Sequence, residues 1–124
     1  MAKILIVDDD PDIVEAGQLV LARAGHQIET AGSRAEGMAK VESFQPDLLL
    51  LDVMMEQPDD GFVMAQDLRR QGKTFPILML TSVSSASGLD FGRDNEMVPV
   101  DDFHAKPIEP AALVQSVARL LQKN

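Results

Sequence analysis

The sequence predicts an α/β fold built around a doubly wound, five-stranded parallel sheet. Short apolar segments alternate with stretches of helical periodicity five times along the 124 residues, which is typical of a parallel sheet covered by helices on both faces. Because crossovers between parallel strands are right-handed, few topologies are open to the chain, and the strand order 2-1-3-4-5 is favoured. In that order a ligand site is expected at the carboxyl ends of strands 1 and 3.

The first strand and the first helix have the clearest patterns. Residues 3–7, KILIV, are apolar and rich in β-branched side chains, which predicts a strand buried on both faces. A helix is expected from Pro11, which suits a first helical turn, to just before Gly25, which suits the position after a helix. Its predicted inward face consists of small and apolar residues: Ile13, Gly17, Val20, Leu21 and Ala24.

The middle of the chain adds the second and third strands. Residues 26–31 predict the second strand, and the S-x-x-E spacing of Ser33 and Glu36 predicts a capping box that opens a helix ending near Phe44. Residues 47–52, DLLLLD, predict the third strand, because a run of leucines bounded by polar residues is typical of a fully buried strand. Both strands extend the expected parallel sheet.

The remaining elements follow the same alternation. A helix is expected over residues 61–71, capped by Asp59 or Asp60, and residues 75–82 predict the fourth strand. Residues 98–106 contain the fifth strand. Serines and glycines interrupt the helical pattern between residues 84 and 99, so only a short helix is expected there. The final helix, residues 110–124, has four residues predicted to face inward: Leu113, Val117, Leu120 and Leu121.

Composition excludes several classes of function. The formal net charge is -9, from 20 acidic and 11 basic residues, and no basic stripe is present, so direct nucleic-acid binding is not expected. The chain has no cysteine, which excludes disulfides, zinc–thiolate sites and thiol nucleophiles. No segment is long enough to cross a bilayer, and acidic residues interrupt the amino-terminal apolar run, so we expect a cytoplasmic protein with no membrane partner.

Polar residues follow strands 1, 3, 4 and 5 of the predicted sheet. Asp8 and Asp9 follow the first strand, Asp52 ends the third, Thr81 ends the fourth, and Lys106 ends the fifth. Because these strands are adjacent in the predicted order, their side chains are expected to converge at one edge of the sheet. The neighbouring Asp10 is better interpreted as the cap of the first helix.

These groups match the needs of phosphoryl transfer to a carboxylate. Clustered carboxylates repel one another, and a hard divalent cation such as Mg²⁺ (or Mn²⁺) relieves that repulsion. A carboxylate within reach of phosphorus acts as a nucleophile and forms a phosphoryl intermediate. The cation, a lysine and a hydroxyl then stabilise the charge on the transferred oxygens.

The segments that carry these residues resemble the receiver domains of bacterial two-component response regulators. ILIVDDDPDI, LLLLDVMM, ILMLTS and FHAKP match the family in order and at near-family spacing, over essentially the full chain. The resemblance implies a flavodoxin-like fold with five helices. Because the chain ends about where the fifth helix is expected to end, residues 1–124 are expected to form a single receiver domain with no output domain, either as a stand-alone receiver or as a fragment of a longer protein.

The resemblance implies a metal site and a phosphoacceptor. Asp52 is expected to accept the phosphoryl group. Asp9 is expected to bind the metal directly, Asp8 to assist, and the backbone carbonyl of Met54 to provide a further ligand. In the family, the residues two after the phosphoacceptor and two after the hydroxyl position help to orient attacking water; here they are Met54 and Val83, which predicts slow autodephosphorylation.

The resemblance also implies a conformational switch. Lys106 is expected to contact the phosphoryl group, and Thr81 to move toward it. Phe103 occupies the position of the family's switch aromatic residue. The loop before Gly61 is one residue longer than is usual in the family, which affects the loop beside the site but none of these residues.

The predicted function is therefore a phosphorylation-dependent signalling switch. A sensor histidine kinase, a phosphotransfer protein or a small phosphodonor is expected to supply the phosphoryl group, and an unknown downstream protein to bind the phosphorylated domain. The domain is expected to be a monomer or an activation-linked dimer. It is not expected to be an enzyme beyond catalysing its own phosphorylation and dephosphorylation.

Two alternatives stay open on sequence grounds. The first is a small phosphatase resembling the haloacid dehalogenase family, whose nucleophile lies on the first strand in a D-x-D-x-[TV] motif. Here Asp12 stands where that motif has Thr or Val, and the chain has no room for a cap domain. The second is a degenerate receiver that binds partners without being phosphorylated, against which the set of Asp9, Asp52, Thr81 and Lys106 argues.

Overall fold

The predicted sheet order is confirmed. The computed structural model describes residues 2–53, 60–82, 100–106 and 109–122. Within them, five parallel strands have the order β2-β1-β3-β4-β5. The strands are β1 (Lys3–Val7), β2 (Gln27–Ala31), β3 (Leu48–Asp52), β4 (Ile77–Ser82) and β5 (Asp102–Lys106).

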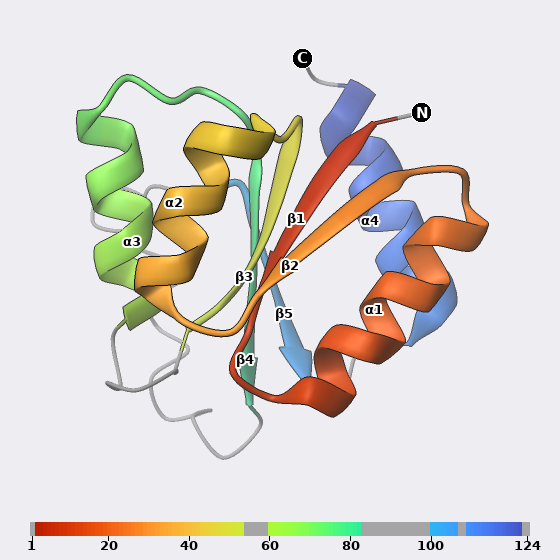
Figure 1. Cartoon of the computed structure of the whole chain (residues 1–124). Helices are drawn as coiled ribbons and strands as arrows, with labels where there is room; N and C mark the ends of the chain where they lie inside the picture. Colours follow the sequence, from red (N-terminus) through yellow and green to blue (C-terminus); the bar gives the residue numbers. More distant parts are fainter. Residues whose placement is uncertain (1, 54–59, 83–99, 107–108, 123–124) are drawn as a thin grey trace.

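Helices cover both faces of the sheet, as the doubly wound fold requires. The helices are α1 (Pro11–Arg23), α2 (Arg34–Phe44), α3 (Asp60–Arg70) and α4 (Pro110–Gln122). Figure 1 shows α2 and α3 on one face of the sheet and α1 and α4 on the other. The short helix expected between residues 84 and 99 falls outside the described residues.

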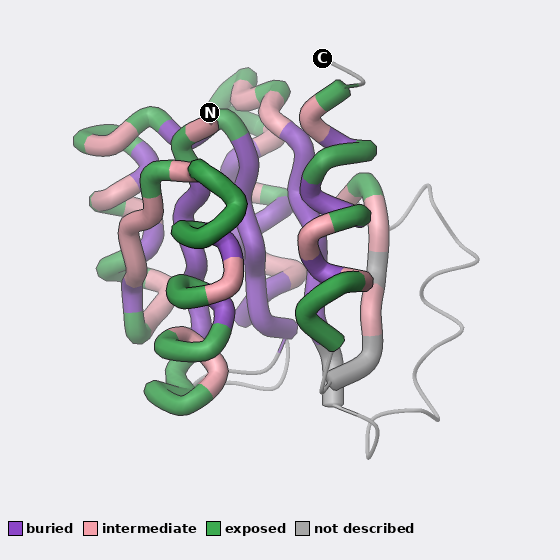
Figure 2. Tube along the Cα trace, turned by 90° about the vertical axis from the view of Figure 1, so that its right-hand side faces the viewer, coloured by how far each residue is buried: buried purple, intermediate pink, exposed green. Residues whose placement is uncertain are grey.

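The core consists of two apolar layers, one on each face. Successive strand residues point to opposite faces, so Leu49 and Leu51 of β3 pack toward α2 and α3, while Leu48 and Leu50 pack toward α1 and α4. All four leucines are at most 2% exposed, and burying each contributes about 2 kcal/mol. Figure 2 shows the buried strands inside the helices, whose outer sides are exposed. β3, which ends in Asp52, is therefore buried on both of its faces.

Local capping signals place the starts of α1 and α2 as predicted, with one difference in the hydrogen bonds of α2, whereas α3 begins at Asp60, one residue earlier than predicted. Asp10 caps α1, because its carboxylate accepts a hydrogen bond from the Asp12 amide at 3.0 Å. Ser33 Oγ accepts from the Glu36 amide at 3.2 Å, but the Glu36 carboxylate accepts from the Gly32 amide, not from that of Ser33. The predicted bond from the Glu36 amide to Ser33 therefore forms, but the Glu36 side chain binds the amide one residue before the expected one.

The predicted inward-facing residues at two helix ends differ in outcome, and Ala24 was predicted wrongly. Ala24 is exposed, because it is the residue after α1 and the chain turns away through Gly25, whose φ is 97°. Leu121, in the last turn of α4, is partly buried and packs against the core, as predicted. Helical periodicity therefore locates the buried side of each helix but overestimates how far that side extends.

Candidate functional site

The ends of β1 and β3 bring three carboxylates together. Val7 pairs with Leu51 in the parallel register, so the residues that follow, Asp8 and Asp52, leave the sheet side by side. Carboxylate oxygens of Asp8, Asp9 and Asp52 all lie within 4.8 Å of one another. The predicted convergence of these three side chains is confirmed.

Backbone contacts fix the two buried members of this acidic cluster. Asp8 is 2% exposed; its amide donates to the Ala31 carbonyl, and its Oδ1 accepts from the Asp10 amide at 2.9 Å. Asp52 is 4% exposed, and the next amide, that of Val53, donates to the Leu80 carbonyl at 2.9 Å. Asp9 is exposed to solvent. The cluster thus consists of two buried carboxylates, those of Asp8 and Asp52, and one that is exposed to solvent, that of Asp9.

The donor set of the acidic cluster fits a hard divalent cation. Two unit negative charges separated by about 5 Å repel one another by on the order of 3 kcal/mol at the effective dielectric constant of a protein surface. A divalent cation among the three converts this repulsion into attraction, and Mg²⁺ is bound by a few carboxylates with several retained waters. Because all the donors are oxygens, the cluster suits Mg²⁺ or Mn²⁺.

The backbones of Thr81 and Lys106 reach the same edge of the sheet. Asp52 pairs with Leu80, so Thr81 is the next residue along the neighbouring strand β4. Lys106 pairs with Ser82 at the end of β5. The side chains of Thr81 and Lys106 lie outside the described part of the structure, so their contacts with the acidic cluster stay predictions.

Two further predicted site residues cannot be placed at the acidic cluster. Phe103 lies on β5 with its backbone paired to Met79, and its side chain lies outside the described residues. Met54, the predicted carbonyl ligand, also falls outside them. Their roles therefore stay predictions.

The start of α3 is a part of the site that sequence reasoning missed. The Gly61 amide donates to the carbonyl of Val53, the residue directly after Asp52, at 2.8 Å. Asp60, the first residue of α3, is 3% exposed, and its Oδ1 lies 3.6 Å from Nε of Arg34 on α2. In the sequence the only signal is an Asp-Gly pair after a loop, which does not reveal a backbone contact.

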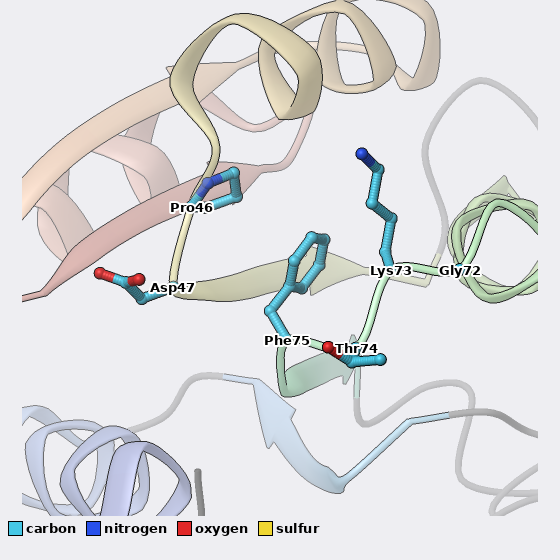
Figure 3. Close-up of a pocket in the computed structure, with 6 residues that line it drawn as sticks. All are labelled: Pro46, Asp47, Gly72, Lys73, Thr74 and Phe75. Atoms are coloured by element: carbon cyan, nitrogen blue, oxygen red, sulfur yellow. The ribbon is translucent and has the colours of Figure 1, made fainter.

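A separate pocket lies at the opposite edge of the sheet. Figure 3 shows its lining at the entries to β3 and β4: Pro46, Asp47, Gly72, Lys73, Thr74 and Phe75. Asp47 accepts a hydrogen bond there from the Lys3 amide, and Lys73 Nζ lies 3.0 Å from a Glu42 carboxylate oxygen. The pocket is therefore not part of the acidic cluster.

Comparisons with known proteins identify the family of this chain. The family described as "Response regulator receiver domain" matches residues 4–118. The alkaline phosphatase synthesis transcriptional regulatory protein PhoP of Bacillus subtilis is 36% identical over 126 residues, covering 98% of this chain and 49% of PhoP. The DNA-binding dual master transcriptional regulator RpaA of Synechocystis is 35% identical, covering 99% of this chain and 50% of RpaA. The chain thus spans about half the length of these curated relatives.

Solved structures show the same fold over whole domains. A putative response regulator from Chloroflexus aurantiacus superposes with a TM-score of 0.85 at 36% identity, covering 98% of both chains. The chemotaxis protein CheY4 of Vibrio cholerae gives a TM-score of 0.84 at 32% identity, covering 97% of this chain and 98% of its own.

None of the helices in the described part of the chain has the length and hydropathy needed to span a bilayer.

The matched family also bears on the alternatives left open by the sequence. The haloacid dehalogenase alternative receives no support, because the matched family covers residues 4–118 and the relatives described above are response regulators. The chain belongs to the response regulator receiver domain family of two-component systems.

Proposed function

We propose that this receiver domain is a phosphorylation-dependent switch whose phosphoacceptor is Asp52. The observation that carries the proposal is the buried Asp52 carboxylate at the end of β3, within 4.8 Å of the carboxylates of Asp8 and Asp9. A nucleophile on a rigid strand end is already oriented for attack, so little entropy is lost in reaching the transition state. Two further acids beside it supply the ligands for a divalent cation.

Asp8, Asp9, Asp52 and the backbone carbonyl of Met54 would hold Mg²⁺ or Mn²⁺. The bound cation supplies charge stabilisation for the phosphoryl oxygens as they transfer. Asp8 and Asp52 form the buried side of this proposed metal site, and the exposed Asp9 forms the side open to solvent and to the donor.

The residues of the chain then carry out the transfer. A carboxylate oxygen of Asp52 attacks phosphorus and forms an acyl phosphate, while the bond from phosphorus to the leaving group breaks. The leaving group is the imidazole nitrogen of a phosphohistidine or the oxygen of a small phosphodonor; it keeps the electron pair and takes up a proton from water. Lys106 and Thr81, whose backbones end the two strands beyond Asp52, stabilise the phosphoryl oxygens.

The output of the switch passes through β4 and β5. Thr81 and Phe103 lie on these strands. Because the two strands are hydrogen-bonded to each other, a displacement of one strand displaces the other. β5 is joined to α4 by polar contacts: His104 Nε2 lies 2.7 Å from Ser116 Oγ, and Arg119 pairs with Asp102. Phosphorylation favours one of two arrangements of this face and so changes its affinity for a partner.

The partners follow from this mechanism. A sensor histidine kinase or a phosphotransfer protein supplies the phosphoryl group, and a downstream protein binds the phosphorylated domain, as a monomer or as an activation-linked dimer. The domain occupies residues 1–124 as a single cytoplasmic unit, and its net charge of -9 disfavours direct contact with nucleic acid. Its only catalysis is its own phosphorylation and dephosphorylation.

One labelling experiment tests the proposal. The chain is incubated with acetyl phosphate and Mg²⁺, intact mass is followed over time, and the label is located by peptide mapping. One phosphoryl group, lost in Asp52→Asn, supports the switch. Multiple turnover with label on Asp8 contradicts it in favour of a phosphatase, and no label on any residue contradicts it in favour of a degenerate receiver.

A further inference from the structure

We propose that the start of α3, and Gly61 above all, positions the phosphoacceptor; this inference rests on the phosphoryl transfer proposed above. The Gly61 amide donates a hydrogen bond to the carbonyl of Val53, with an N···O distance of 2.8 Å. Val53 directly follows Asp52, so α3 is joined by its second residue to the strand end that carries the nucleophile. No other residue of the site is needed for this link.

Only glycine fits at this point of contact. A Cβ atom at position 61 would lie 2.2 Å from the backbone oxygen of Asp52, 3.0 Å from its carbonyl carbon and 2.7 Å from Cα of Val53. All three obstacles are backbone atoms, which cannot move aside as the end of a side chain can. Any side chain at position 61 therefore displaces either the backbone of the phosphoacceptor or α3 itself.

α3 is held too firmly to take up the whole displacement. Met64, Ala65 and Leu68 are fully buried in the core beneath it, so withdrawing the helix opens cavities in a packed interior. Asp60 is buried beside Arg34, which ties the first residue of α3 to α2. The strand end at Asp52 thus takes part of the shift.

Two other glycines provide contrast. At Gly17 of α1 an added Cβ would lie 3.3 Å from Ile6 Cδ1 and 3.9 Å from a Leu50 methyl group, both ends of flexible side chains. At Gly32 it would lie 3.7 Å from Glu36 Oε1, an ordinary contact. Neither added atom reaches the backbone of a site residue, so both positions serve as matched controls.

The consequence is a loss of alignment at the nucleophile. A misplacement of about 1 Å costs on the order of 10²-fold in rate when a reaction depends on orientation. Gly61 is accordingly a positioning residue, because it meets the backbones of Asp52 and Val53 and acts through the placement of Asp52.

The test compares Gly61→Ala with Gly17→Ala and Gly32→Ala in the full chain. Because the chain has no tryptophan or tyrosine, folding is followed by far-ultraviolet circular dichroism in urea, and Mg²⁺ binding by calorimetry. Transfer from acetyl phosphate is measured by intact mass at saturating Mg²⁺. We expect Gly61→Ala to bind Mg²⁺ more weakly and to be phosphorylated about tenfold or more slowly, with both controls within about twofold of the parent chain. A folded Gly61→Ala variant with the parent rate and affinity overturns the inference.

A second pair of variants serves if Gly61→Ala does not fold. Arg34→Gln keeps the glycine but removes the guanidinium beside Asp60 at the start of α3, and because the Arg34 side chain is 41% exposed we expect the variant to fold. Lys40→Gln also removes a positive charge and its ion pairs from α2, but its partners are Glu29, Glu36 and the Thr30 carbonyl, none of which belongs to the acidic cluster or to α3. At saturating Mg²⁺ we expect Arg34→Gln to be about twofold to fivefold slower than Lys40→Gln. Equal rates overturn the inference.

Failure of the proposed function is distinguishable from failure of this inference. If the parent chain is not labelled on Asp52, the proposed function fails, and the Mg²⁺ affinities of Gly61→Ala and its controls still test positioning. If the parent chain is labelled on Asp52 and Gly61→Ala is labelled equally fast while folded, the inference alone fails.

Discussion

The two edges of the sheet use acidic residues in different ways. At the amino edge, Asp47 and Asp101 directly precede β3 and β5, and each accepts the first backbone amide of a neighbouring strand. Asp47 accepts from Lys3 at 2.8 Å, and Asp101 accepts from Ile77 at 2.8 Å. Asp101 also pairs with Arg69 at 3.0 Å. These acids hold the strand entries together.

At the carboxyl edge the acids gather with one another. Asp8, Asp9 and Asp52 follow β1 and β3, and their carboxylates lie within 4.8 Å of one another. Asp10 is the exception, because it caps α1.

The difference comes from the polarity of a parallel sheet. All strands begin at one edge, where Asp47 and Asp101 each accept the first amide of a neighbouring strand, and all end at the other, where Asp8, Asp9 and Asp52 lie beside one another. An acid before a strand is thus a structural residue. A cluster of acids after the strands gains little from the sheet itself and indicates a ligand site.

The largest expected effect is at the carboxyl edge. Asp52→Asn is expected to abolish phosphoryl incorporation while leaving the free energy of unfolding unchanged or raised, because one member of a repelling cluster becomes neutral. Intact mass after acetyl phosphate treatment and urea unfolding give the two readouts. Residual labelling at Asp52→Asn that maps to Asp8 or Asp9 would show that the wrong nucleophile has been assigned.

The next effect is stabilisation by the metal. Mg²⁺ at about one hundred times its dissociation constant is expected to raise the free energy of unfolding by about 2.7 kcal/mol, since the unfolded chain does not assemble the cluster. Removal of Mg²⁺ with a chelator should reverse the gain. Asp9→Asn should reduce it, whereas Asp47→Asn, at the other edge, should not. If both variants lose the same part of the Mg²⁺ stabilisation, the metal is not bound specifically at the carboxyl edge.

A smaller effect is expected from the amino edge. Asp101→Ala removes the acceptor for the Ile77 amide and the partner of Arg69, and is expected to lower the free energy of unfolding by about 1 to 2 kcal/mol. Because Asp101 is partly exposed, its ion pair with Arg69 adds little to this figure. The phosphorylation rate of the folded fraction should stay at the parent value; a large drop in that rate would show that the two edges are coupled.

The rate at which phospho-Asp52 loses its phosphoryl group tests the role of Met54 at the carboxyl edge. Met54 has no polar group with which to hold attacking water, so phospho-Asp52 is expected to decay slowly. Met54→Asn is expected to hasten decay by up to about tenfold, the effect of one added hydrogen bond. Decay is followed by intact mass after the phosphodonor is removed. If phospho-Asp52 decays within seconds in the parent chain and Met54→Asn does not change the rate, the prediction is wrong.

The smallest expected effect is a pH dependence at the amino edge. Burial, and then the positive amino terminus, lower the pKa of His26, whose Nδ1 accepts the Ala2 amide at 3.2 Å. The unfolded chain therefore binds a proton more readily below about pH 6.5, and stability falls as pH drops through this value toward the folded pKa. Between about pH 7 and pH 5, His26→Gln should lose slightly less stability than the parent chain in urea unfolding. An identical pH profile would show that His26 does not contribute.

Much of the fold could be predicted because periodic patterns record burial directly. The leucines of β3 face both layers of the core, and a short run of consecutive apolar residues is typical of a strand buried on both sides. The wrong predictions, Ala24 and the return bond of Glu36, lie at helix ends, where the turn of the chain and not the periodicity decides which groups meet.

The sequence by itself determined the alternation of strands and helices, the parallel order and the gathering of Asp8, Asp9 and Asp52. Those features follow from hydrophobic period and chain direction, which are local properties of the sequence. Only the tertiary structure decided that Gly61 touches the backbone of Asp52 and that Asp47 and Asp101 close the opposite edge. Such contacts depend on distances between segments far apart in the chain, and residue type alone does not encode these distances.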